Sequence, residues 1–163
     1  MSANFIARWS LKTHWPTYAA AAQAAGRSPD PASWHVARSI YVDETDAAAE
    51  AFVTQPGGAF DYYYEYLFAI FDRSNYKGPF IVNPTDDPEQ LTPQALRDAC
   101  VIHGSPETVA RKVLELQEEI GHFGTLMYAA HDWQDPVRMK RSMRLMAQEV
   151  MPRVNRAQRD KAA

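Results

Sequence analysis

The residues with the clearest chemical potential follow two predicted strands. His131 comes just after the apolar run 125–129, and Asp43 and Glu44 directly follow the run 34–42. In parallel α/β sheets, functional side chains gather at the carboxyl ends of the strands, so these positions are the first candidates. The imidazole of His131 can move a proton near neutral pH. The alternative is a loop histidine that caps the next helix, and the sequence alone leaves both open.

The other reactive side chains form no recognisable site. Cys100 is the only cysteine, so the chain can form neither an internal disulfide nor a cysteine metal cluster, and we interpret it as a buried structural thiol. The remaining histidines lack metal-ligand spacing such as HxxxH, and we therefore predict no metal site. They are His14, His35, His103 and His122.

A long proline-rich segment interrupts the middle of the chain. Residues 74–93 contain four prolines and one glycine, and long loops in compact domains are often functional. We predict a mobile loop over 74–100 that includes a short helix over 92–99; a plain surface connection is the alternative. Arg73 and Lys77 can contact an anion there, although solvated surface charges would explain both residues equally simply.

Helix and strand patterns alternate along the rest of the sequence. Apolar spacing and capping residues predict helices over 11–25 and 59–73, a helix through 47–53 with its N-cap and acidic first turn within 43–46, and strands over 34–42 and 125–129. They also predict a helix from Ser105-Pro106 to Gly121 and a last helix from Asp135-Pro136 that ends before Pro152, with a disordered tail over 155–163. About two parallel strands are too few for a stable sheet. The fold is therefore either part of a larger α/β protein or mostly α.

Composition points to one ordinary globular domain. The chain has 163 residues, 46% of them hydrophobic and 23% charged, and a net charge of −3; this gives no reason to expect a nucleic-acid partner. The basic residues near the C-terminus lack the interleaved aromatic side chains of a nucleic-acid surface. We find no membrane-spanning run and no signal peptide, so a cytoplasmic location is the default expectation.

Four phrases, in order, resemble the C-terminal portion of the luciferase-like flavin-dependent monooxygenases, with the limonene- and alkane-oxidising members most similar. They are THWPTYAAAAQAAGRSPDP and WHVARSIYVDETDAAAEA, around the seventh strand of the family's (β/α)₈ barrel; HGSPETVARKVLELQEEIGHFGTLMYAAHDW, around the eighth; and SMRLMAQEVMPRV, the last helix. The resemblance covers residues 9–154. It implies a single partial domain, the C-terminal part of a TIM barrel, because such barrels need about 250 residues.

The resemblance implies an FMN-dependent monooxygenase. In that family a separate reductase supplies reduced FMN, O₂ adds to it as a peroxyflavin, and a small organic substrate is oxygenated, while the protein holds the flavin and excludes water. Most flavin contacts of the family belong to a portion without a counterpart here. We therefore expect this chain to be a truncated portion, inactive alone and dependent on association, such as a homo-oligomer.

The resemblance also implies roles for individual residues. His131 becomes the candidate catalytic residue, and Asp132, Trp133 and Tyr128 become candidates for lining the flavin or the substrate, although Trp133 and Tyr128 could equally be core residues. Arg73 and Lys77 fall where the family has its mobile lid and could contact the FMN phosphate. The first strand carries Ala37 and Ser39 where a sulfonate-oxidising branch has Arg and His, which favours a less charged, apolar substrate.

Two other functions remain open at this stage. A non-catalytic oligomerisation or interaction module would use the aromatic helix over 60–71 and the unpaired strand edges as a dimer surface. A piece of an F420-dependent oxidoreductase would share the fold and differ in its deazaflavin cofactor.

Overall fold

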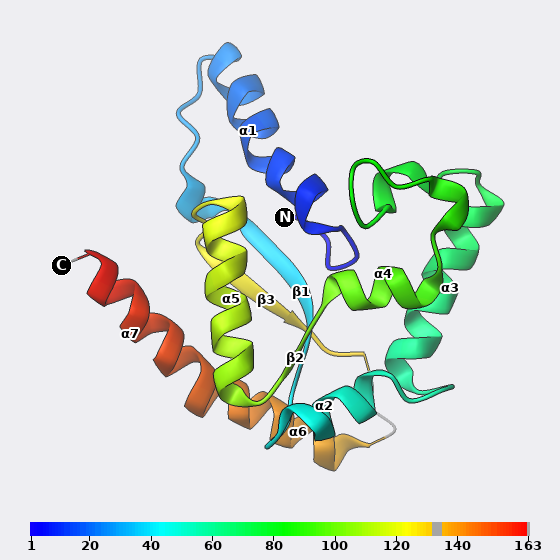
Figure 1. The fold of residues 1–163 in the computed structure, drawn as a ribbon. Helices are drawn as coiled ribbons and strands as arrows, with labels where there is room; N and C mark the ends of the chain where they lie inside the picture. The colour runs from blue at the N-terminus through cyan, green and yellow to red at the C-terminus, as the bar shows by residue number, and fades with distance from the viewer. Residues whose placement is uncertain (132–134, 163) are drawn as a thin grey trace.

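A three-stranded parallel sheet lies at the centre of the structure, a computed structural model that describes residues 1–131 and 135–162 (Figure 1). Strand β1, His35–Val42, lies in the middle, between β2, Val101–Gly104, and β3, Thr125–Ala129. β2 pairs with the C-terminal half of β1, from Ser39 opposite Val101 to Val42 opposite Gly104, and β3 pairs with the N-terminal half. The carboxyl ends of all three strands consequently point the same way.

The strand β2 corrects the prediction of about two strands. Its four residues, VIHG, are too few to show an alternating pattern, and only the edge of β1 far away in the sequence makes them a strand. The prediction that residues 125–129 form a strand is confirmed, but the strand is less buried than an apolar run would suggest. Thr125 and Met127 lie on the same face of β3 and both are exposed, which shows that the described elements leave this part of the face uncovered.

The helices in the first two thirds of the chain begin and end close to the predicted positions. They are α1, Arg8–Ala24; α2, Asp46–Val53; α3, Ala59–Arg73; α4, Pro93–Cys100; and α5, Pro106–Ile120. Thr45 caps α2, Thr92 caps α4 and Ser105 caps α5, each by accepting a bond from a backbone N–H in the first turn. At the end of α5, Gly121 has a φ of 94°, which other residues rarely adopt.

Helix α1 begins one turn earlier than predicted, so Pro16 lies inside it rather than near its start. Its N-cap, Ala7, makes no side-chain capping bond, and this start therefore carries no signal in the sequence.

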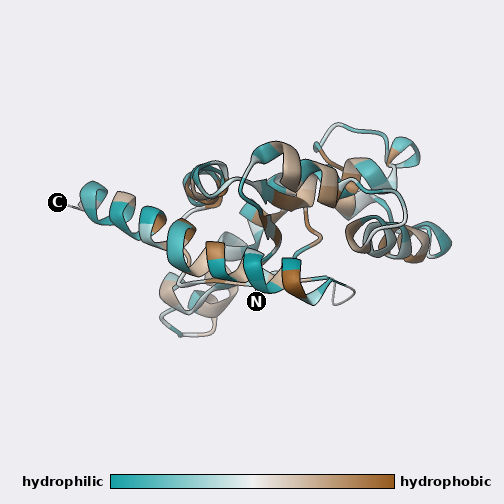
Figure 2. Ribbon diagram, turned by 90° about the horizontal axis from the view of Figure 1, so that it is seen from below, coloured by the Kyte–Doolittle hydropathy of each residue, from teal (hydrophilic) through white to brown (hydrophobic). Residues whose placement is uncertain are grey.

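The C-terminal helix is longer than the sequence suggested. Helix α6, Pro136–Leu145, continues through a π-helical turn, Met146–Val150, into α7, Met151–Ala162. Pro152 lacks a backbone N–H, and the wider π turn just before it allows the helix to continue past the proline. The tail predicted as disordered from residue 155 is thus helical to Ala162. Figure 2 shows α7 as a mostly hydrophilic helix that projects from the sheet.

Two hydrophobic clusters hold these elements together. One lies between the sheet and helices α1, α5 and α7 and includes Val36, Ile40 and Val113. The other joins Tyr41 of β1 to α2, α3 and α4 and includes Phe60. No helix among the described residues is long and apolar enough to cross a membrane.

Candidate functional site

His131 lies at the carboxyl end of β3 and reaches across to the middle of β1. Its Nε2 is 2.6 Å from the hydroxyl oxygen of Ser39. Two more side chains converge on that oxygen: the Tyr64 hydroxyl from α3 and the Asn4 amide nitrogen from the N-terminal segment, each at 3.0 Å. Four polar side chains from four separate parts of the chain therefore meet at one hydroxyl group, which we call the Ser39 cluster.

Aromatic rings enclose the imidazole of His131. The ring of Tyr63 stacks on it with the centroids 4.0 Å apart, and the edge of Phe60 approaches at 5.1 Å. The Tyr63 hydroxyl also exchanges hydrogen bonds with the side-chain amide of Asn4. Stacking on one side and an edge contact on another restrict rotation of the imidazole, so the two ring nitrogens keep distinct directions.

Burial determines the protonation of the groups in the Ser39 cluster. It lowers the pKa of His131 to about 4, because the charged imidazolium loses hydration. The same loss of hydration raises the pKa of Tyr64 well above its ordinary value. At neutral pH the cluster therefore consists of neutral hydrogen-bonding groups, with a histidine that can donate at one nitrogen and accept at the other.

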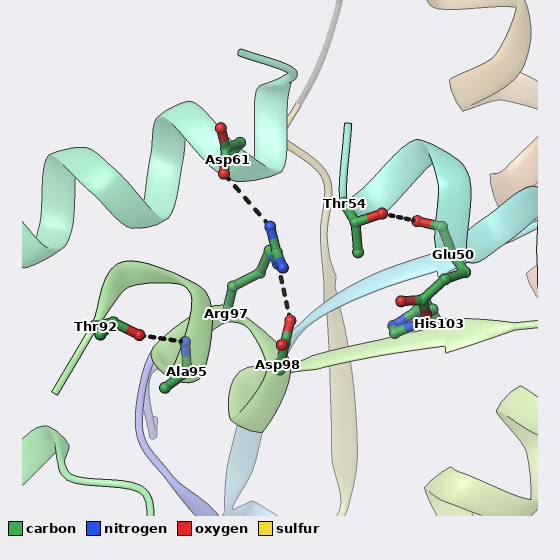
Figure 3. Close-up of polar contacts among 8 residues, drawn as sticks. All are labelled: Glu50, Thr54, Asp61, Thr92, Ala95, Arg97, Asp98 and His103. Atoms are coloured by element: carbon green, nitrogen blue, oxygen red, sulfur yellow. Dashed lines mark hydrogen bonds and ion pairs between the residues drawn. The ribbon is translucent and has the colours of Figure 1, made fainter. Parts of the chain in front are cut away.

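A pair of ion contacts fixes the helix that carries Tyr63 and Tyr64. Figure 3 shows Arg97 of α4 between Asp61, in the first turn of α3, and its neighbour Asp98. The nitrogen–oxygen distances are 3.4 Å and 2.9 Å, and the Arg97 side chain is only 8% exposed. A mostly buried cation that spans two helices holds α3 in register over the sheet.

Tyr128 and Asp43, which the sequence also suggested as site residues, make their contacts away from His131. The hydroxyl of Tyr128 lies 2.8 Å from that of Ser142 on α6, which accepts a bond from the backbone N–H of Val42. Asp43 is buried and accepts bonds from Tyr41 and Arg141. The structure does not bring either residue into the Ser39 cluster.

The basic residues of the predicted loop also lie apart from the Ser39 cluster. Lys77 is buried and its Nζ contacts Asp72 at 3.0 Å and Glu89 at 2.9 Å. These bonds raise the pKa of Lys77, with Glu89 contributing most. Arg73 is exposed at the last turn of α3. Lys77 and the stacking of Phe80 on Phe71 attach the loop to α3; its mobility stays a prediction.

Asp132 and Trp133, the other two predicted lining residues, lie outside the described residues.

A large hollow of the described surface lies away from His131. It is a groove of about 720 Å³ between α5 and α7 that reaches Gly124 and Leu126 beside β3. Val113, Phe123 and Val154 contribute apolar surface to it. Its lining includes Leu126 of β3 and none of the four side chains of the Ser39 cluster.

Comparison with known proteins identifies relatives of the chain. No family model matches it. It is 33% identical over 147 residues to 3,6-diketocamphane 1,6-monooxygenase of Pseudomonas putida, which covers 89% of this chain and 38% of the relative. It is 34% identical over 147 residues to 2,5-diketocamphane 1,2-monooxygenase 2 of the same organism, covering 88% and 40%. Limonene 1,2-monooxygenase of Rhodococcus erythropolis is 28% identical over 146 residues, covering 89% and 35%.

A solved structure agrees with these sequence matches. The oxygenating constituent of 3,6-diketocamphane monooxygenase from the CAM plasmid of Pseudomonas putida, a Type II Baeyer-Villiger monooxygenase in complex with FMN, superposes with a TM-score of 0.73 and 34% identity. The chain is a homologue of these luciferase-like monooxygenases. The family resemblance and the fold class, part of an α/β barrel, are thereby confirmed. The match covers 87% of this chain and 39% of the solved one, so the chain spans about two fifths of its luciferase-like relatives.

The sequence pointed to His131 but missed most of its partners. The sequence identifies Ser39 only as a position on the first strand, and it does not single out Asn4, Tyr63 or Tyr64 as site residues. Tyr64 lies in the helix predicted over 59–73, and the contact of its hydroxyl with Ser39 depends on how α3 docks on β1. The one available signal was the run of three tyrosines at 62–64, which exceeds what a buried stripe needs.

Proposed function

We propose that this chain carries part of an FMN-dependent monooxygenase that oxygenates a small apolar organic substrate with O₂, with reduced FMN supplied by a separate reductase. The observation that carries the proposal is the Ser39 cluster at the carboxyl end of β3, in a chain 34% identical to a solved FMN complex. Because the chain spans about two fifths of its relatives, we expect flavin binding without turnover from these 163 residues alone.

The residues of the site fit the ring of a flavin better than its phosphate. Flavin rings present nitrogen and oxygen atoms around a flat apolar face, and the site offers the neutral imidazole of His131 beside the aromatic ring of Tyr63. A phosphate favours cations, but Lys77 is paired with two carboxylates. Arg141 is paired with Asp43 and Glu44.

Bound reduced flavin supplies the reaction with O₂, and the protein's own residues prepare the surroundings. His131, neutral at pH 7, donates or accepts a hydrogen bond without bringing a charge. Phe60 and Tyr63 shield two sides of the imidazole from water, which strengthens that hydrogen bond. The neutral groups of the Ser39 cluster suit an apolar substrate, and FMN in the relative's structure favours FMN over a deazaflavin.

A flavin titration tests the proposal. Purified protein is titrated with FMN and, separately, with riboflavin, which lacks the phosphate, while flavin fluorescence is followed. Saturable quenching by both flavins with similar affinities supports a ring site within this chain. His131→Gln should weaken binding of both, whereas His122→Gln, the same substitution at an exposed residue, should not. Absence of quenching from folded protein at millimolar flavin contradicts the proposal.

A specific surface favours a second candidate, an association module. Tyr62, Tyr66 and Ile70 of α3 share one face and are 67%, 56% and 42% exposed. Exposed apolar side chains at this spacing suit contact with another protein surface, in keeping with the expected homo-oligomer. Light scattering tests this candidate: a stable dimer that Tyr66→Lys converts to a monomer supports it, and a monomer at high concentration excludes it.

A further inference from the structure

The hydroxyl of Ser39 is surrounded by three hydrogen-bonding partners in a place closed to solvent. Ser39 and Tyr64 are both 0% exposed. The Ser39 oxygen lies 3.0 Å from the Tyr64 hydroxyl, 3.0 Å from the Asn4 amide nitrogen and 2.6 Å from His131 Nε2. Because Ser39 is closed to solvent, the protons must be shared among these four groups.

The numbers of donors and acceptors in the Ser39 cluster determine where each proton lies. A serine hydroxyl donates one hydrogen bond and accepts two. The Asn4 amide nitrogen can only donate, and the Tyr64 hydroxyl donates to Ser39 as well. Both acceptor positions of Ser39 are then filled, so its single proton points to His131 Nε2. A neutral imidazole that accepts at Nε2 carries its own proton on Nδ1.

An arrangement in which Ser39 donates its proton to the Tyr64 hydroxyl is less favourable. If Ser39 donated to Tyr64, the buried phenol proton would need another acceptor, and Ser39 is the acceptor that the Tyr64 hydroxyl contacts among the described residues. Buried tyrosine hydroxyls seldom leave their proton without a partner. Transfer of the Tyr64 proton through Ser39 is also unfavourable, since a buried phenolate would result.

We propose that Ser39, held by Tyr64 and Asn4, is a positioning residue that fixes His131 in the tautomer with its proton on Nδ1. His131 then presents an N–H donor, rather than a base, to an electron-rich oxygen or ring nitrogen of a ligand at the carboxyl end of the strands. Stacking on Tyr63 holds the imidazole in the required orientation. The ligand in this statement rests on the proposed function; the tautomer does not.

The tautomer can be measured directly without a ligand. Protein with ¹⁵N-labelled histidine is studied at pH 7.5 by long-range ¹H–¹⁵N correlation, which distinguishes protonated from unprotonated ring nitrogens. We expect His131 to show a protonated Nδ1 and an unprotonated Nε2. A protonated Nε2 in the wild-type protein would overturn the proposal, whatever the variants do.

Substitutions then test whether Ser39 is the cause. Ser39→Ala should move the His131 signals toward a mixture of the two tautomers, and Ser39→Thr, which keeps the hydroxyl, should restore them. Ser33→Ala is the matched control, because Ser33 is exposed and bonds only to Asp30 among the described contacts. Unchanged His131 signals in folded Ser39→Ala protein would refute the positioning role.

Measurements of flavin binding distinguish failure of this proposal from failure of the proposed function, on which only the ligand depends. Loss of one well-oriented hydrogen bond should weaken FMN affinity of Ser39→Ala roughly 3- to 10-fold. The predicted tautomer in a protein that binds no flavin would contradict the proposed function and support the positioning role. Flavin binding by a protein with His131 protonated on Nε2 would support the proposed function and contradict the positioning role.

Discussion

Acidification should destabilise the wild-type protein more than a His131→Gln variant. Burial lowers the pKa of His131 from 6.5 to about 4 in the folded protein, whereas the unfolded chain keeps the ordinary value. Above pH 6.5 the imidazole is neutral in both states and contributes no pH dependence. Between pH 6.5 and 4 only the unfolded state takes up the proton, so the free energy of unfolding falls as the pH falls.

The size of this effect follows from the two pKa values. Between them each pH unit costs about 1.4 kcal/mol. From pH 7.5 to pH 5 the wild-type protein should therefore lose about 2 kcal/mol relative to the variant, and about 3 kcal/mol by pH 4. The carboxylates that titrate in this range are common to both proteins and cancel in the difference.

Urea unfolding at several pH values between 7.5 and 5 measures the difference. His122→Gln, on an exposed side chain, is the matched control. Parallel stability curves for the wild-type and His131→Gln proteins would refute the reasoning, since they would mean that His131 takes up its proton as readily in the folded as in the unfolded state. The assignment of His131 as a neutral hydrogen-bonding group would then fail as well.

Three further predictions concern the surroundings of the site. Arg97→Met should destabilise the fold by roughly 3 kcal/mol in urea unfolding, because it leaves the mostly buried Asp61 carboxylate without its cation; Asp98→Asn, at a side chain 62% exposed, should cost less than about 1 kcal/mol. Cys100 should resist a thiol reagent in folded protein and react on unfolding, because burial raises its pKa to about 11. Met139→Ala should cost about 2–5 kcal/mol, since Met139 is 0% exposed in the second hydrophobic cluster.

Local signals predicted much of the fold. Helix α3 has the bounds 59–73 that its apolar spacing indicated, and the caps at Thr45 and Ser105 begin the predicted helices. These features depend on neighbours within one or two turns, which a sequence pattern records. Strand β2 and the continuation of α7 past Pro152 depend instead on distant pairing and on a π turn, and neither leaves a periodic signal.

The candidate site was less predictable than the fold because its residues are distant in the sequence. His131 could be proposed because it follows a strand directly. The role of Ser39 depends on parts of the chain 25 to 92 residues away, namely Tyr64 and His131. No pattern within a window of the sequence brings these side chains together; only the packing of α3 against β1 does.

The proposed site would bind the flavin ring and leave the flavin phosphate to other residues. The groups suited to the ring belong to β1, α3 and the end of β3, all within this chain. One face of β3 is open at Met127, which is 39% exposed, the 720 Å³ groove reaches Leu126 on the opposite face, and homologous proteins have a further three fifths of their length. If that remainder covers β3 and supplies the phosphate contact, this chain should not distinguish FMN from riboflavin. A clear preference for FMN would instead place a phosphate site in this chain, with Arg73 as the first residue to substitute.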